Sequence, residues 1–204
     1  MYKLYPSLLL GFHGCEKDVA ERVLGSSRIG LEPKPQEYDW LGHGVYFWEN
    51  SPDRAMDFAR KKKGITDPAV LGAIIQPMRC FDLLDFHSLA LLKDAHHALE
   101  ESCERDGLSL PKNTNHFPAE DILFRYLDCA VIEFMHSTLR DLKEPPYDVV
   151  RGVFQEGHEL YSGAGFNEKN HIQLCVRNAN CIKGYFRPLD KPKHDIYPEL
   201  VKLR

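Results

Sequence analysis

The order of apolar and polar positions predicts alternating strands and helices in the first third of the chain. Residues 8–12 form a short apolar run that predicts a buried strand, and residues 45–48 form a second run, rich in strand-forming side chains. Residues 18–24 predict a short helix, because their apolar side chains fall on one face. A further helix is expected to begin at Ser51-Pro52, since serine can cap a first turn and proline suits the first helical position.

The rest of the chain predicts a helical middle followed by a return to strands. Helices are expected over residues 87–105 and 119–142, and the second is apolar around so much of its circumference that we expect it to be well buried. Five further strands are expected, over residues 70–76, 79–84, 148–154, 171–177 and 182–186. The sequence therefore predicts one α+β domain over residues 1–204, with a helical insertion at about 85–142.

The composition of the chain indicates the class of protein and the cellular compartment to expect. Hydrophobic residues make up 43% of the chain and charged residues 27%, which excludes a wholly disordered protein. The net charge of −4 disfavours broad binding to polyanions. No apolar run approaches the roughly 18 residues of a membrane span, and the first residues do not resemble a signal peptide. We therefore expect a cytoplasmic protein with no membrane partner.

The spacing of cysteines and histidines does not indicate a metal centre. The six cysteines include no Cys-x-x-Cys pair, and neither Cys175 with Cys181 nor His96-His97 has the spacing of zinc ligands. In a reducing compartment such cysteines are most often free, buried thiols. We therefore expect unpaired thiols and no bound metal.

Two segments in the first third of the chain carry candidate chemistry. Gly11-Phe12-His13-Gly14 places His13 at the end of an apolar strand, and Gly14 would let a ligand approach the backbone closely. Residues 42–51 run from two glycines through an aromatic strand into a helix, and Tyr46 in that strand could stack on a planar ring. Each segment also has an ordinary explanation, a histidine with satisfied hydrogen bonds and a tyrosine in the core.

A third segment lies on a late strand. In residues 171–176 polar and apolar side chains alternate, so Gln173 faces away from its neighbours Ile172 and Leu174. Its amide is expected either to face a binding cleft or to belong to a strand with one solvated face.

Taken together, the order of these segments resembles the ADP-ribosyltransferase superfamily, on the side of diphtheria toxin and the poly(ADP-ribose) polymerases. Members of that family carry a triad of His, Tyr, and Glu or a substitute. His13 matches the His, Tyr46 in Gly44-Val45-Tyr46-Phe47 matches the Tyr, and Gln173 falls at the third position. The matches cover residues 8–60 and 148–187. The resemblance implies a split antiparallel β-sheet with NAD bound in its cleft.

The resemblance also implies how this chain would hold NAD. Backbone groups of Gly14 would hold the nicotinamide carboxamide, and His13 would hydrogen-bond the ribose hydroxyls near the adenosine half. Tyr46, together with Phe58 in the following helix, would sandwich the nicotinamide ring. Breaking the bond between nicotinamide and ribose builds positive charge on the ribose, which the site must stabilise more than it stabilises bound NAD.

The third position departs from the family's glutamate. Gln173 is neutral, and in the family a residue other than Glu goes with transfer of single ADP-ribose units rather than chain elongation. Glu156, Glu159 or Glu168 could supply the missing negative charge, and the sequence leaves open which of them does.

The resemblance therefore implies mono-ADP-ribosyl transfer to a macromolecular acceptor, either protein or nucleic acid. By analogy, such a domain would suit an intracellular toxin or defence effector with an antitoxin-like inhibitor. An NAD-dependent RNA 2′-phosphotransferase is an alternative, which would need arginines such as Arg151, Arg177 and Arg187 around a phosphate. An inactive module that binds NAD or ADP-ribose is another, and the neutral Gln173 favours it.

Overall fold

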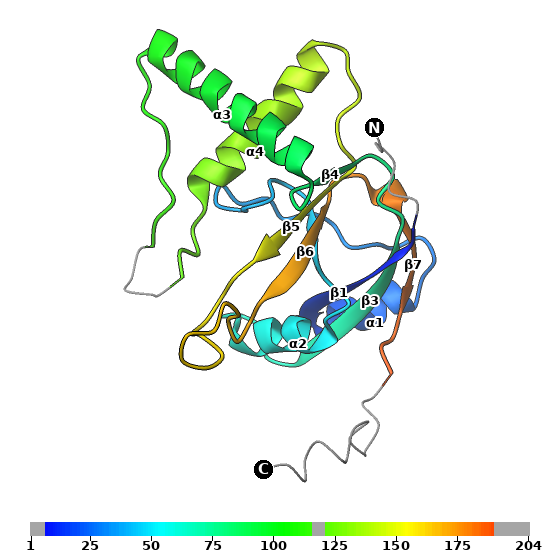
Figure 1. Cartoon of the computed structure of the whole chain (residues 1–204). Coiled ribbons are helices and arrows are strands. Elements are labelled where there is room, and N and C mark those ends of the chain that lie inside the picture. Colours follow the sequence, from blue (N-terminus) through cyan, green and yellow to red (C-terminus); the bar gives the residue numbers. More distant parts are fainter. Residues whose placement is uncertain (1–6, 116–120, 190–204) are drawn as a thin grey trace.

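The computed structural model describes residues 7–115 and 121–189, which form one seven-stranded sheet with four α-helices (Figure 1). The helices are α1 (Lys17–Leu24), α2 (Pro52–Lys61), α3 (Phe86–Asp106) and α4 (Tyr126–Asp141). The strands are β1 (Leu9–Glu16), β2 (Val45–Glu49), β3 (Pro68–Ile75), β4 (Cys80–Asp82), β5 (Val149–Phe154), β6 (His171–Val176) and β7 (Ile182–Phe186). The predicted α+β class is therefore confirmed.

The strand order in the sheet is β4-β5-β6-β2-β1-β3-β7. Five neighbouring pairs are antiparallel, but β4 and β5 run parallel, so the sheet is mixed rather than wholly antiparallel as expected. A parallel pair needs a long crossover connection, and here α3 and α4 lie in the chain between β4 and β5. The helical insertion thus supplies the connection that makes this pair parallel.

The sheet opens between its two central strands. β1 pairs with β3 along its whole length, and β2 pairs with β6 from Val45 to Trp48. Between β1 and β2, however, the register contains only the pairs Gly11 with Glu49 and Phe12 with Trp48. Beyond Phe12 and Trp48 the two strands no longer pair, and we call this place the fork.

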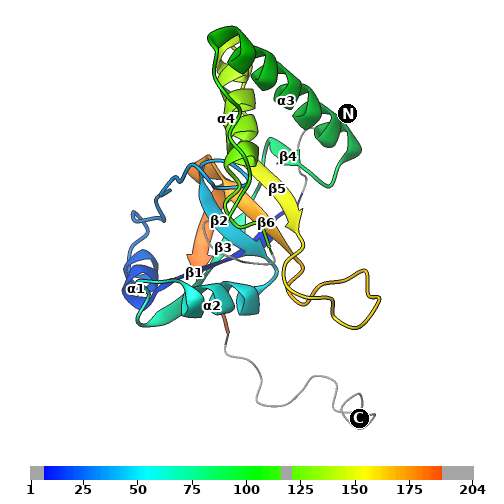
Figure 2. The same ribbon diagram turned by 90° about the vertical axis from the view of Figure 1, so that its left-hand side faces the viewer.

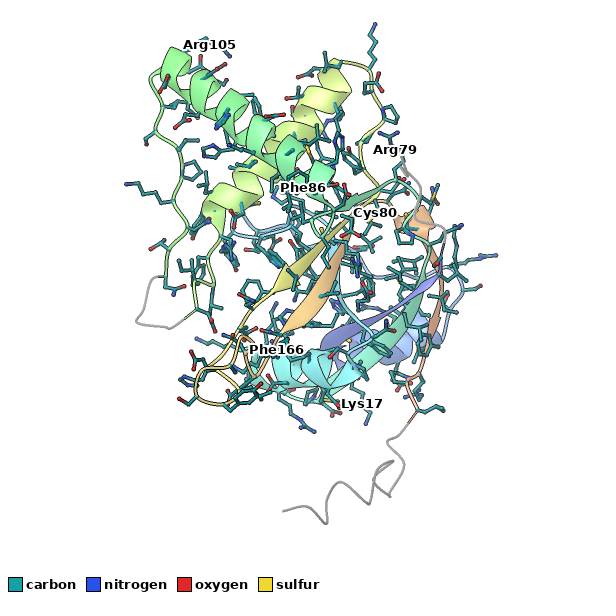
Figure 3. The ribbon with its side chains drawn as sticks, in the orientation of Figure 1. Lys17, Arg79, Cys80, Phe86, Arg105 and Phe166 are labelled. Atoms are coloured by element: carbon teal, nitrogen blue, oxygen red, sulfur yellow. The ribbon has the colours of Figure 1, made fainter. Side chains whose placement is uncertain are left out.

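The core joins the two halves of the sheet on either side of the fork. One buried cluster takes side chains from both halves: Leu9, Val45, Phe47, Ala73, Ile75, Val149, Leu174, Val176 and Cys181. Helices α1 and α2 pack on β1 and β3 at one end of the molecule, whereas α3 and α4 pack on each other at the opposite end (Figure 2) and cross in the view of Figure 1. Figure 3 labels Phe86 at the end of α3 nearer the sheet and Arg105 near its outer tip.

The second long helix starts later than predicted. Residues 119–120 lie outside the described part of the chain, and the helix begins only at Tyr126. The Asn113 side chain fixes this start, because its Oδ1 accepts hydrogen bonds from the backbone N–H groups of Leu127 and Asp128. The apolar Ile122 and Leu123, which suggested helix, precede it and are 49% and 44% exposed.

Two details of the expected elements near the fork are also corrected. Strand β1 continues to Glu16, so His13 lies inside a strand rather than at its end. Ser51 does occupy the N-cap position of α2, and Pro52 the first helical position, but the Ser51 hydroxyl makes no capping hydrogen bond. Backbone bonding starts the helix instead, with Ala55 N–H donating to the Ser51 carbonyl at 3.3 Å.

The structure agrees with the prediction of free cysteine thiols. All six cysteines are free, with Cys15, Cys129, Cys175 and Cys181 buried and the other two half-buried. Within the described residues, no helix has the length and apolar character needed to span a bilayer.

Candidate functional site

His13 lies at the fork and is fixed there by the neighbouring strand. Its Nδ1 lies 2.7 Å from the backbone carbonyl of Tyr46, and because a carbonyl can only accept, Nδ1 carries the proton. The other nitrogen, Nε2, is therefore the acceptor of the neutral ring. Burial lowers the pKa of His13, and the ammonium groups of Lys62 and Lys34 lower it further. His13 is thus a neutral side chain with one oriented acceptor nitrogen, close to two cations.

Gly14 presents its backbone groups to the fork. Asn50 N–H donates to the Leu10 carbonyl at 2.9 Å, so the backbone groups of Leu10 point toward β2. Alternate residues of a strand point to the same side, and the N–H and C=O of Gly14 therefore also point that way, where β2 has no residue paired with them. The lack of a side chain has a separate cause, because a Cβ on Gly14 would lie 2.1 Å from the Ala55 carbonyl oxygen of α2.

Tyr46 lies next to His13 but is held by the preceding loop. Its hydroxyl donates to the Gly42 carbonyl at 2.8 Å and accepts from Leu41 N–H at 2.9 Å. The ring packs against a buried cluster that includes Ile132 and Met135 of α4, and burial raises the pKa of its hydroxyl. The packing agrees with the interpretation of Tyr46 as a core residue, and its position on β2 places it beside the fork.

Phe58 is placed on α2, over the same sheet face as Tyr46. Its ring lies 4.9 Å from that of Trp48, and the Lys62 ammonium lies 4.9 Å from its centre. Within the described residues, the structure brings Phe58 into ring contact with Trp48 and not with Tyr46. Tyr46 and Phe58 therefore lie on neighbouring elements, and the ring that Phe58 contacts is that of Trp48.

Gln173 shares this sheet face with Tyr46. Trp48 is paired with Gln173 and Tyr46 with Cys175, and paired residues of antiparallel strands project to the same face. The Gln173 Oε1 accepts a hydrogen bond from the indole N–H of Trp40 at 2.7 Å. Trp40 therefore fixes the amide orientation, and no sequence signal pointed to it because the two residues lie 133 positions apart.

The three glutamates that could supply a charge have different surroundings. Glu156 pairs with Arg54 of α2 at 2.6 Å and with Lys169 at 3.6 Å. Glu159 accepts a hydrogen bond from Gly163 N–H within the loop between β5 and β6. Glu168 lies against Gly157 in the same loop. Of the three, Glu156 is the one that bonds to α2, the helix that carries Phe58.

The sequence did not indicate that α4 supports the loop holding Tyr46. The Glu133 carboxylate of α4 accepts from His43 N–H at 2.8 Å and pairs with the Arg177 guanidinium. Burial opposes ionisation of Glu133, but the bonds from Arg177 and His43 outweigh it and lower its pKa. Gly42, with a φ of 76°, leaves the space that these side chains fill. The helical insertion is thus joined to the candidate site.

Across residues 7–115 and 121–189, no three His, Cys, Asp or Glu side chains gather as ligands for a metal ion.

Comparison with known proteins adds one relative and no function. No family model and no solved structure matches the chain. The chain is similar to an uncharacterized protein of Methanocaldococcus jannaschii, with 27% identity over 94% of each chain.

Proposed function

We propose that the protein transfers single ADP-ribose units from NAD to a macromolecular acceptor, with NAD held at the fork. The supporting observation is the sheet order β6-β2-β1, which places Gln173, Tyr46 and His13 on three consecutive strands, with an opening between the last two. The three residues come from segments separated by up to 160 positions in the sequence. Tyr46 and Gln173 share one sheet face, whereas His13 projects to the opposite face beside Phe47, so a ligand at the fork would contact groups from both faces through the opening.

The groups at the fork suit the parts of NAD. His13 Nε2 can accept a hydrogen bond from a ribose hydroxyl, because its Nδ1 is committed as a donor to Tyr46. The N–H and C=O of Gly14 complement a carboxamide, which has one acceptor and one donor group. Lys34 and Lys62, which act electrostatically on His13, supply positive charge for a diphosphate.

The neutral third residue favours transfer of one unit over elongation of a chain. As the bond between nicotinamide and ribose breaks, positive charge develops on the ribose, and an oriented amide oxygen stabilises it less than a carboxylate does. The Gln173 oxygen is oriented by Trp40. Tyr46 does not serve as a base at neutral pH, since burial raises its pKa.

The structure gives less support to an RNA 2′-phosphotransferase. Each arginine considered for a phosphate is already paired with carboxylates: Arg151 with Glu49 and Asp82, Arg177 with Glu133, and Arg187 with Glu21. Binding a phosphate there would require breaking these pairs. The other alternative, an inactive module that binds NAD or ADP-ribose, is still favoured by the neutral Gln173. It differs from the enzyme only in lacking turnover of NAD.

The test is to incubate the protein with NAD labelled in its adenine half, with and without cell extract, and to measure free nicotinamide and labelled macromolecules. We expect nicotinamide release together with label on one class of macromolecule. His13→Ala should lower both by at least tenfold while circular dichroism stays unchanged, because ribose orientation is lost. His97→Ala, on the exposed side of α3, is the matched control and should behave like wild type. Saturable NAD binding without nicotinamide release would contradict enzymatic transfer and favour the binding module.

A further inference from the structure

His171 is a buried histidine on the sheet face that also carries Tyr46 and Gln173. It is 8% exposed and begins β6, where its register partner is Phe154. Because Gln173 lies two residues further along the strand, both side chains project to the same face. The His171 ring lies 5.5 Å from the ring of Phe154 and 6.2 Å from that of Trp48. It therefore occupies the end of the face beyond Gln173, on the side away from Tyr46.

One ring nitrogen of His171 is committed by the backbone. Nδ1 lies 2.6 Å from the Lys169 carbonyl, which only accepts, so Nδ1 carries the proton. Nε2 is then the basic nitrogen of the neutral ring. The same bond holds the ring in a fixed orientation relative to Lys169, which belongs to the loop between β5 and β6.

Two charged side chains act electrostatically on this ring, Arg54 of α2 and Glu156 of the loop between β5 and β6. Glu156 pairs with Arg54 and also with Lys169 of the same loop. Burial lowers the pKa of His171, the Arg54 charge lowers it further, and Glu156 and the Lys169 carbonyl oppose the change. A neutral imidazole is therefore present at pH 7, and Glu156 is placed to stabilise the cation that forms when the ring takes up a proton.

We propose that His171 is the general base that removes a proton from the acceptor during transfer. The proposal rests on the function proposed above. An acceptor hydroxyl attacks the ribose carbon that bears nicotinamide, and its oxygen forms the new bond to that carbon. The carbon–nitrogen bond breaks and its electron pair leaves with nicotinamide. The hydroxyl proton passes to Nε2 of His171 and from there to solvent.

This role places the acceptor at a defined position. The rise of about 3.3 Å per residue sets His171 about 7 Å from Gln173 along β6, which leaves room for the acceptor beyond the ribose. It also defines acceptor chemistry, because a carboxylate is already deprotonated and needs no base. The expected product is accordingly an ADP-ribosyl group on a hydroxyl, a linkage that neutral hydroxylamine does not cleave.

The test compares His171→Asn and His171→Ala with the wild-type protein in the labelling assay. Asparagine keeps an N–H for the Lys169 carbonyl but has no basic nitrogen, so it separates the chemistry from the fold. A general base contributes about 10²–10⁴-fold, and we expect both variants to lose at least a hundredfold in transfer while NAD affinity changes little. Added imidazole should restore part of the activity of His171→Ala and none of His171→Asn, whose side chain fills the space. His97→Asn is the matched control.

The pH profile gives an independent measurement. Wild-type transfer should fall at acidic pH, because protonation of His171 removes the base, and the Asn variant should lack this acid limb. Transfer by folded His171→Asn at the wild-type rate would overturn the proposal, as would label released by neutral hydroxylamine. Either result leaves the proposed function intact if the wild-type protein transfers label, whereas absence of nicotinamide release from the wild type would contradict the function itself.

Discussion

At the scale of single residues, three histidines share one hydrogen-bond arrangement. His13, His136 and His171 each place Nδ1 within 2.8 Å of a backbone carbonyl, and the carbonyl fixes the proton on that nitrogen. Burial lowers the pKa of all three. This hydrogen bond to the backbone orients a neutral ring without using a second side chain. Two of these rings lie on the central strands of the candidate site, and the third lies in α4.

Tyr46 gives a prediction that separates its two roles. Tyr46→Phe removes both bonds of the hydroxyl to the loop at Leu41 and Gly42, and should cost about 1–3 kcal/mol of stability. It keeps the ring, so NAD affinity should fall little. Tyr46→Ala should lower stability by about 3–5 kcal/mol and also weaken NAD binding. Urea unfolding and calorimetric NAD titration check this. Unchanged NAD affinity in folded Tyr46→Ala would assign the ring to the core alone.

At the scale of elements, the short apolar runs were predictable and the contacts between distant segments were not. The predicted strand over 182–186 is confirmed as β7, and the aromatic run at 45–48 as β2, because β-branched and aromatic side chains pack well on a sheet. The start of α4 was predicted wrongly, since an asparagine from the preceding segment sets it. The hydrogen bond between Trp40 and Gln173 depends on tertiary folding, and no local sequence pattern predicts it.

Gly14 provides a prediction about how α2 meets β1. A Cβ there would lie 2.1 Å from the Ala55 carbonyl oxygen and 3.2 Å from the Ala59 side chain. The Ala55 carbonyl belongs to the backbone of α2 and cannot move alone, so Gly14→Ala should cost about 3 kcal/mol or more by displacing the helix. Gly184→Ala in β7, with no atom within 4 Å of the added Cβ, is the matched control and should change stability by under about 0.5 kcal/mol. Equal melting temperatures for the two variants would show that α2 does not pack this closely.

At the scale of the whole molecule, side-chain packing rather than strand pairing joins the two halves of the sheet. Only two register pairs connect β1 to β2, whereas a single buried cluster draws on both halves. The fork is therefore an opening in the hydrogen-bond ladder above a continuous core. In this arrangement the backbone of β1 is unpaired with β2 beyond Phe12, while the His13 ring lies beside Phe47 of the buried cluster.

The buried histidines make the stability of the whole protein depend on pH. His136 is fully buried, and burial lowers its pKa from 6.5 to about 4, with a further contribution from Arg177. The unfolded chain therefore binds a proton between about pH 6.5 and 4 that the folded protein excludes, so stability falls as the pH drops through this range. A shift of this size corresponds to about 3 kcal/mol, most of it lost by pH 4.5. His13 and His171, whose pKa values are also lowered, act in the same direction.

We therefore expect the free energy of unfolding, measured in urea, to be about 2 kcal/mol or more lower at pH 5 than at pH 8. His136→Gln removes the titrating group, so this variant should be less stable at pH 8, where it loses a packed ring, but should show a smaller loss between the two pH values. His97→Gln should keep the full pH dependence, because His97 is exposed on α3. If His136→Gln and wild type lose the same free energy between pH 8 and pH 5, burial of His136 does not control the acid sensitivity of the fold.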